Sequence, residues 1–328
     1  MLMRELPAEA LLTRDGHAVR LNSSDCNWTE VPSVAGQEVA LADWDTMQRA
    51  REAWARKLDY AVELAYVTHE LLLARLLRVR KMRILFSEVI YSRRAIERWF
   101  RFTPHEIRFG EFAPDTLAEY DVLVPLNMAD VRRLDGMRHL IAHNRLPIPC
   151  SEAIEICDDK LLFARVMQQK GFGDLIPALL DDRELPYVFK MRRDRGGRLT
   201  RVVLSADDER ELPVELGDDC FRQALIPGRF EYATHLLFLK NRPVRWLTFE
   251  YDMRQEHQVK GPLRPARKRM IECRHLDAFS AMLSAIGFEG LCCIDFKEQQ
   301  DRPLIMEINP RVGESLCPYF FSYLRDLE

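Results

Sequence analysis

The most constraining feature of this sequence is a pair of apolar segments near its C-terminus, LCCIDF at 291–296 and LIMEIN at 304–309, joined by the polar segment KEQQDRP. Two apolar segments separated by a short polar turn predict two antiparallel strands. Alternate side chains of a strand share a face, so Glu307 and Asn309 should point one way with Ile305, while Met306 and Ile308 point the other. If the strands pair, Asp295 of the first strand can lie beside Glu307 and Asn309 of the second.

Carboxylate and amide oxygens are the ligands that magnesium prefers in proteins. Three such side chains on one hairpin therefore predict a divalent-cation site. The alternative is a strand end whose polar side chains only reach solvent. Glu307 and Asn309 alone do not decide between a cation site and a solvent-exposed strand end, so the rest of the sequence has to be considered.

Composition narrows the class of protein. A chain of 328 residues has room for about two or three structural units, and 47% apolar with 30% charged residues is ordinary for a soluble domain. The net charge of −3 gives no general attraction for nucleic acid. The eight cysteines show no CxxC spacing, which favours reduced thiols. No apolar stretch approaches the roughly 20 residues of a membrane span. We therefore expect a cytoplasmic protein without a span.

The first part of the chain predicts an N-terminal extension, residues 1–81. Residues 1–36 are polar and suggest irregular structure, whereas 41–80 contain no Gly or Pro and show apolar residues at helical spacing. The helix ends in the basic segment RLLRVRK. It could pack on its own protein or on a second copy in a homodimer, or it could dock on a partner or a membrane surface.

Residues 82–150 predict a small parallel sheet. Apolar segments at MRILFSEV, HEIRFG and YDVLVPL alternate with helical stretches, and LPIPCS at 146–151 suggests a fourth, edge strand. No GxGxxG follows the first strand, so a dinucleotide site is not expected there.

Two lysines in the next segment occupy unusual positions. Asp158 is a candidate N-cap for a helix over 161–169, which places Lys160 in the first turn, where the helix dipole disfavours a cation unless an anion is near. Lys190 lies within an apolar strand, and a buried charge needs a partner. RRDRGG then predicts a hairpin turn whose arginines suit phosphate oxygens. The alternatives are that Lys160 points to solvent and that the arginines are solubilising residues at an exposed hairpin tip.

The segment QALIPGRFE at 223–231 predicts a nucleotide contact. An apolar strand end at Ala224–Ile226 can offer backbone groups to a purine, and Glu231 can accept hydrogen bonds from ribose hydroxyls.

Taken together, these segments resemble the ATP-grasp superfamily of carboxylate–amine (or thiol) ligases, over about Met82 to Ser315. The resemblance is carried by DDKLLFARVMQQKG, YVFKMRRDRGGRLT, QALIPGRFEYATHL and DFKEQQDRPLIMEINPR. The last is the most specific, with an acidic residue followed about a dozen positions later by E-x-N-P-R. The resemblance implies an α/β (α+β) ATP-grasp fold, with a pre-ATP-grasp domain over 82–150, an ATP-grasp domain over 151–328, a lid subdomain at about 185–226 and a metal-binding subdomain at about 229–328.

The resemblance also implies roles for individual residues. Lys160 and Lys190 match the two lysines that contact the phosphates of ATP, and Arg311 matches the arginine beside the reaction intermediate. Asp295, Glu307 and Asn309 match the ligands of Mg²⁺, which Mn²⁺ could replace. The remaining matches are the phosphate lid at Gly196, Gly197 and Thr200, the adenine contacts at Gln223, Ala224, Leu225 and Ile226, and the ribose contact at Glu231.

Two features depart from the family pattern. The lid reads GGRLTR where a run of small residues is usual, and the N-terminal extension lies outside the family core.

The implied activity is ATP-dependent ligation, in which a small-molecule carboxylate is activated as an acylphosphate and then attacked by an amine. A bicarbonate-using carboxylase and a non-catalytic nucleotide-binding regulatory protein remain open as alternatives. In this family the corresponding region often lies near the acceptor site, so the basic segment QVKGPLRPARKRM suggests that Arg264 or Arg267 binds an anionic substrate; a solvated loop is the alternative. His235 and His257 are expected to be structural, since this chemistry needs no imidazole.

Overall fold

The computed structural model describes residues 11–14, 17–21, 28–30, 44–88, 90–181, 184–194, 197, 199–212, 217–259 and 265–327. The chain forms two compact units, Met1–Val62 and Glu63–Glu328. The first contains an antiparallel sheet of β1 (Leu11–Arg14), β2 (His17–Leu21) and β3 (Trp28–Glu30) and the start of helix α1 (Trp44–Leu76). The expectation of irregular structure over 1–36 was therefore wrong for these strands. Asp15-Gly16, a dipeptide typical of tight hairpin turns, was the signal that indicated otherwise.

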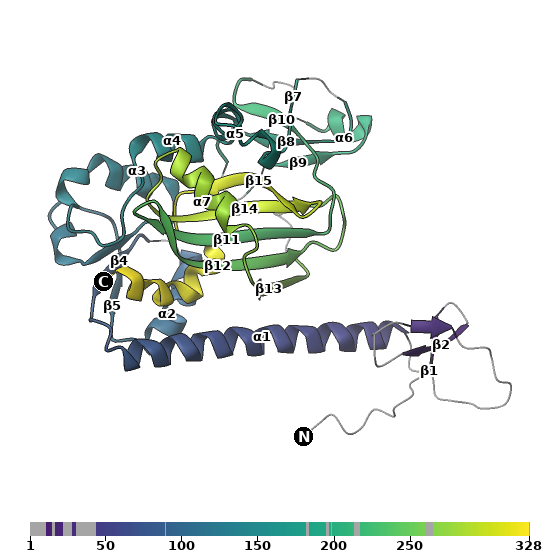
Figure 1. Cartoon of the computed structure of the whole chain (residues 1–328), viewed down its shortest axis with the longest axis horizontal. Helices are drawn as coiled ribbons and strands as arrows, with labels where there is room; N and C mark the ends of the chain where they lie inside the picture. The colour runs from purple at the N-terminus through teal and green to yellow at the C-terminus, as the bar shows by residue number, and fades with distance from the viewer. Residues whose placement is uncertain are drawn as a thin grey trace. The chain divides into compact units, whose positions relative to one another are not determined.

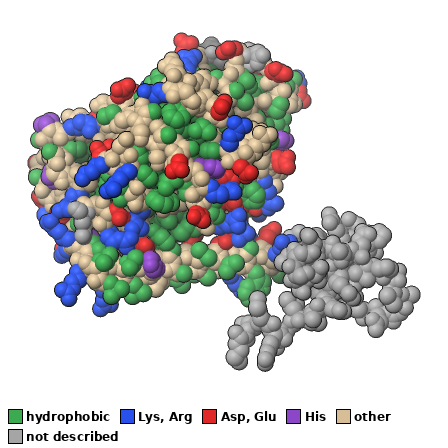
Figure 2. Space-filling view, viewed as in Figure 1, with side chains coloured by type: hydrophobic (Ala, Val, Ile, Leu, Met, Phe, Trp, Pro, Cys, Tyr) green, Lys and Arg blue, Asp and Glu red, His purple; other side chains and the backbone are tan. Residues whose placement is uncertain are grey.

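Helix α1 confirms the long helix expected from its periodicity, and its last part belongs to the second unit. Val67 is buried there, the Tyr66 hydroxyl lies 2.8 Å from Ser322 Oγ, and Glu70 pairs with Arg245 at 3.2 Å. The second unit begins at Glu63, within α1, because side chains after Val62 pack into its core; the predicted domain bounds stay predictions. Other side chains of α1 are apolar and exposed, as the green atoms along the helix in Figure 2 show, among them Trp54, Leu58, Leu72 and Leu76.

The small parallel sheet expected within 82–150 is present. Its strands, in the order β5-β4-β6, are β4 (Arg83–Phe86), β5 (Glu106–Phe109) and β6 (Val122–Val124). They alternate with α2 (Ile90–Phe100) and α3 (Met128–Gly136), and with the 3-10 turns η1 (Leu117–Glu119) and η2 (Arg138–Leu140). The fourth strand expected at 146–151 does not form. Pro147 and Pro149 have no N–H group to donate to a neighbouring strand, which accounts for the difference.

A second sheet carries the predicted hairpin. It has the order β7-β10-β8-β9, and we call it the lid sheet; its strands are β7 (Leu179–Leu180), β8 (Tyr187–Met191), β9 (Arg201–Val203) and β10 (Cys220–Ala224). β8 and β9 pair antiparallel across RRDRGG, which confirms the hairpin; we call these two strands and the connection between them the lid hairpin. The helices in this part of the chain are α4 (Ser151–Asp158), α5 (Lys160–Gln169), the 3-10 turn η3 (Gly173–Leu175) and α6 (Ala206–Arg210), of which α6 packs against β9.

The largest sheet is antiparallel, with the order β13-β12-β11-β14-β15, and we call it the central sheet. Its strands are β11 (Phe230–Leu239), β12 (Arg242–Asp252), β13 (Arg267–Ile271), β14 (Gly290–Gln299) and β15 (Arg302–Asn309). Figure 1 shows α7 (Leu276–Ala285) on one side of this sheet, and α2 with the yellow C-terminal 3-10 segment η4 (Glu314–Leu327) on the other. Each side has its own apolar core.

The two faces of the central sheet differ in composition. On the face toward α5 and α7, which we call the covered face, Tyr232 lies directly opposite Phe296, and both belong to the apolar core on that side. On the other face, which we call the site face, Ala233 lies opposite Asp295. The expected position of Ile305 beside Glu307 was wrong, because β15 carries a bulge at Met306 that returns Ile305 to the covered face, opposite Phe296.

Candidate active site

The β14–β15 hairpin brings the predicted metal ligands together. Asp295 is directly opposite Glu307, and Cys293 is opposite Asn309, so all four share the site face. Asn309 Nδ2 donates to Asp295 Oδ2 at 3.2 Å and to Glu307 Oε1 at 3.0 Å. The convergence predicted from strand alternation is confirmed. These residues fit a hard divalent cation, since two carboxylates and an amide meet at one point.

Lys160 provides a positive charge beside these carboxylates. It is the first residue of α5 and is buried, and its Nζ lies 3.1 Å from Glu307 Oε2 and donates to the carbonyl of Asp194 at 3.2 Å. Burial raises the pKa of Glu307, but Lys160, Asn309 and Lys190 outweigh it and hold that pKa at about 2. Burial alone would lower the pKa of Lys160, and Glu307 raises it above its ordinary value. Both groups are therefore ionised at neutral pH.

The N-cap of α5 is Asp159, one residue after the position expected. Its Oδ1 accepts from the N–H groups of Leu161 and Leu162, both at 3.1 Å. Asp159 is fully buried, and Arg192 of the lid hairpin donates to it at 2.6 Å. The backbone N–H of Lys160 also donates to the carbonyl of Arg192 at 2.9 Å. The start of α5 and the lid hairpin are thus joined beside the Lys160 side chain.

Arginines of the lid hairpin were expected to face phosphate oxygens, and two of them are already engaged. Arg192 binds Asp159, and Arg193 donates to Glu155 at 3.3 Å. The anionic partners of these two arginines are thus carboxylates of the protein, Asp159 at the N-cap of α5 and Glu155 in α4. Further along, the Thr200 N–H donates to the carbonyl of Gly197 at 3.1 Å, and Gly197 has a φ of 64°, so these two lie in one tight turn. Gly196 lies outside the described residues.

Lys190 is the second buried lysine, on β8. Its Nζ donates to Gln223 Oε1 at 2.8 Å, and Gln223 Nε2 donates to the carbonyl of Pro177 at 3.0 Å. Burial lowers the pKa of Lys190 to about 8, with Lys160 acting in the same direction and Glu307 opposing it. Lys190 is therefore deprotonated at a lower pH than Lys160.

The connection from the lid sheet to the central sheet contains the predicted adenine contacts. Ala224 ends β10, Leu225 and Ile226 follow it, and Glu231 is buried near the start of β11. Glu231 lies close enough to Lys190 to raise its pKa. Glu307 and Asp295 act on the pKa of Lys190 in the same direction, so the predicted ribose contact and metal ligands lie near the same lysine.

The sequence analysis missed Lys297, two residues beyond Asp295 on β14. Its buried Nζ donates to the carbonyls of Ile226, Gly228 and Gln258, at 3.2, 2.9 and 3.0 Å. The signal was available, because a lysine within an apolar strand had already singled out Lys190. Alternation also places Lys297 on the face of Asp295.

Of the two arginines predicted to bind an anionic substrate, the structure describes only Arg267, which does not share a face with the metal ligands. Arg264 lies outside the described residues. The pairing of β13 with β12 sets Arg267 opposite Asp252 and Lys268 opposite Tyr251, so Arg267 lies on the covered face and Lys268 on the site face. Arg311, which follows β15, donates to Asn309 Oδ1 at 3.4 Å and is adjacent to the metal ligands.

Comparison with known proteins identifies the fold. No protein-family model and no curated protein matches the chain. Among solved structures, D-alanine–D-alanine ligase from Bacillus anthracis matches with a TM-score of 0.52 and 15% identity, over 76% of this chain and 96% of that one. An L-amino acid ligase from Bacillus licheniformis matches with a TM-score of 0.51 and 14% identity, over 74% of this chain and 70% of that one. The chain has an ATP-grasp fold.

The ATP-grasp fold accounts for the position of the cluster. Lys160 and Lys190 come from α5 and the lid sheet, and the carboxylates come from the central sheet, so the charged groups meet where these elements of the second unit come together. In the described part of the chain, no three side chains of His, Cys, Asp or Glu gather as an alternative metal site. None of the helices described is both long and apolar enough to cross a bilayer.

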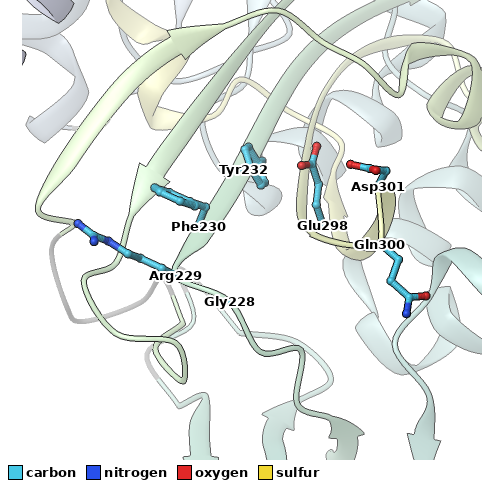
Figure 3. A pocket seen from close by; sticks show the side chains of 7 residues that line it. All are labelled: Gly228, Arg229, Phe230, Tyr232, Glu298, Gln300 and Asp301. Atoms are coloured by element: carbon cyan, nitrogen blue, oxygen red, sulfur yellow. The ribbon is translucent and has the colours of Figure 1, made fainter. Parts of the chain in front are cut away.

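A pocket of about 320 Å³ lies elsewhere in the second unit (Figure 3). It is lined by Gly228, Arg229, Phe230, Tyr232, Glu298, Gln300 and Asp301. Tyr232 belongs to the covered face of the central sheet, so this pocket lies behind the sheet as seen from Asp295. The cluster of lysines and carboxylates, and not this pocket, has the chemistry that the sequence predicted.

Proposed function

We propose that this protein is an ATP-dependent ligase that phosphorylates a carboxylate and joins it to an amine. The proposal rests on one observation, the cluster of Lys160, Lys190, Asp295, Glu307 and Asn309 between the lid and central sheets. A nucleotide-binding protein without turnover would not need two carboxylates and an amide held beside two buried lysines. Transfer of a phosphoryl group needs positioned positive charge and a cation site.

The reaction has two steps. An oxygen of the substrate carboxylate attacks the γ-phosphorus of ATP, and the bond to ADP breaks. The amine nitrogen then attacks the acyl carbon of the acylphosphate, the C–O bond to phosphate breaks, and the nitrogen loses a proton. Phosphate is a far better leaving group than oxide, which is why the carboxylate has to be phosphorylated first.

The lysines would neutralise the phosphates. The ammonium of Lys160 bridges Glu307 and the lid carbonyl of Asp194, so phosphate oxygens entering there meet a cation that is already positioned. Lys190 lies on the lid side and would contact the phosphates next to the adenosine. Arg311 would stabilise charge on the acyl carbon's oxygen as the amine adds.

Asp295, Glu307 and Asn309 would hold Mg²⁺. When bound, this ion neutralises phosphate charge and aligns the phosphates for transfer. Ala224–Ile226 would contact adenine and Glu231 the ribose. The lid hairpin, with Gly197 and Thr200 in its turn, would exclude water from the acylphosphate.

The test is release of ADP by the purified protein with Mg²⁺, in a screen of amino acids and small di-acids in pairs. We expect release that requires both an acid and an amine and that falls at least about 100-fold in Glu307→Gln. Glu298→Gln is the matched control, because it makes the same change on the opposite face of the same hairpin.

Other outcomes distinguish the alternatives. Release driven by bicarbonate would indicate a carboxylase. Tight binding of ATP without release for any pair, and without an effect of Glu307→Gln, would contradict the ligase and favour the regulatory protein. Assignment of Arg264 and Arg267 to an anionic substrate stays a prediction, and an unchanged KM for every substrate in Arg264→Ala and Arg267→Ala would exclude it.

A further inference from the structure

Lys297 makes an unusual set of contacts for a lysine on a central strand. Its side chain is 1% exposed, and its three N–H groups have three main-chain partners, the carbonyls of Ile226, Gly228 and Gln258. An ammonium group has three donors and no acceptor, so its hydrogen-bonding capacity is fully used. None of the three acceptors is a carboxylate.

The three carbonyls belong to two separate segments. Ile226 and Gly228 lie in the connection 225–229, which joins β10 of the lid sheet to β11 of the central sheet, and Gln258 follows β12. The two segments also contact each other directly, since the Gly228 N–H donates to the carbonyl of Glu256 at 3.0 Å. One side chain of β14 therefore joins two segments that are distant from it in sequence.

The connection held by Lys297 is the one expected to contact adenine. Lys297 lies two residues from Asp295 on the same strand and face, a separation of about 7 Å along the strand. It therefore stands between the adenine side and the metal side of the proposed nucleotide site. Burial lowers the pKa of Lys297. The carboxylate of Glu231, the expected ribose contact, acts in the opposite direction and favours the charged form of Lys297.

An apolar side chain would serve better if this position only filled the core. Burying an ammonium is unfavourable unless its donors are satisfied, and the carbonyls would still need partners without it. The contacts of Lys297 are useful if the connection 225–229 has to be held in one conformation.

We propose that Lys297 is a positioning residue that holds the connection 225–229 against β14, so that the adenine side of the nucleotide site is fixed relative to Asp295. This inference rests on the proposed function, because it takes the nucleotide to be ATP. It predicts that Lys297 supports the part of the affinity that depends on adenosine and not the part that depends on phosphates.

The experiment compares direct binding of ATP and of tripolyphosphate by calorimetry, in the presence of Mg²⁺, to the wild type, Lys297→Met and Lys297→Gln. We expect Kd for ATP to rise about tenfold to a hundredfold in Lys297→Met, and less in Lys297→Gln, which keeps two donors. Kd for tripolyphosphate should stay within about twofold, because Lys160 and Lys190 are untouched. Hydrogen exchange of 225–229 should become faster in both variants.

Phe296→Leu is the control for a general loss of packing. It alters the adjacent residue on the covered face and should leave both Kd values within about twofold. The inference is overturned if Lys297→Gln binds ATP as the wild type does, or if ATP and tripolyphosphate weaken equally. A wild-type protein that binds no ATP would instead contradict the proposed function itself.

Discussion

The two faces of the central sheet use the same strands for opposite purposes. On the covered face, Phe296 stacks on Tyr232 with ring centroids 5.1 Å apart and meets the edge of Phe279, also at 5.1 Å. On the site face, the neighbouring residue Asp295 meets Glu307 and Asn309. Consecutive residues of one strand thus belong to an apolar core and to a charged cluster.

Residues that stabilise the fold and residues that carry charge can therefore alternate within a single strand. A pleated strand isolates its two faces, so the polar groups of the site face need not interrupt the apolar packing behind them. We expect substitutions on the covered face to change mainly the free energy of unfolding. Substitutions of the charged residues on the site face should change mainly binding and turnover.

The largest expected effect is that of Phe296→Ala. Removing a fully buried aromatic ring should lower the free energy of unfolding by about 3–5 kcal/mol. Denaturant unfolding followed by circular dichroism measures this. Turnover per folded molecule should change little. A loss of turnover without a loss of stability would contradict the separation of the faces.

Asp295→Asn is the counterpart on the site face. It keeps the shape of the side chain but removes one of the two carboxylates, so ADP formation should slow by about 100-fold to 1000-fold. The free energy of unfolding should change little, because Asn keeps the shape of the side chain. Rapid-quench measurement of ADP, together with the same unfolding assay, tests both statements. Full activity in this variant would remove Asp295 from the site.

Gly313→Ala tests the packing at the end of the site face. A β-carbon added there would lie 2.4 Å from His235 Cε1 and 3.1 Å from Cys293 Sγ, so the buried imidazole would have to move. We expect a loss of about 1–3 kcal/mol in stability, measured by thermal unfolding. Gly136→Ala is the control, since nothing lies within 4 Å of the added atom. Equal effects at the two positions would show that steric contact is not the cause.

The smallest effect is a pH dependence of ATP affinity that comes from Lys190. Because burial lowers its pKa to about 8, the free protein loses this proton above pH 8, while phosphates should restore the charge when ATP binds. Affinity should therefore fall as pH rises, by about tenfold between pH 7 and pH 9. Calorimetry in two buffers also detects the proton taken up. Lys190→Arg should bind without this dependence, and an equal slope in that variant would assign the titration to another group.

Much of the candidate site could be predicted from local sequence. Strand alternation was enough to group Glu307 with Asn309, and the hairpin signal brought Asp295 to them. Lys160 and Lys190 were conspicuous because a helix N-terminus and an apolar strand are both poor places for a cation without a partner. These inferences depend only on neighbours along the chain.

Other features depended on partners that are distant in sequence. Arg192 could bind phosphate or Asp159, and packing of the lid hairpin against α5 selected Asp159. The register of β13 on β12 placed Lys268 and not Arg267 on the site face. The bulge at Met306 likewise exists only in the pairing of β15 with β14.

Local sequence was therefore sufficient to predict most of the helices and strands and most of the side chains that share a face, because both follow from periodicity and turn chemistry. Which buried charges meet depends instead on the tertiary fold, because a desolvated ion pairs with the group that the packing of remote segments brings within reach. Lys297 shows this most clearly. Its place on the face of Asp295 is local, whereas its three carbonyl partners come from segments about 40 to 70 residues away.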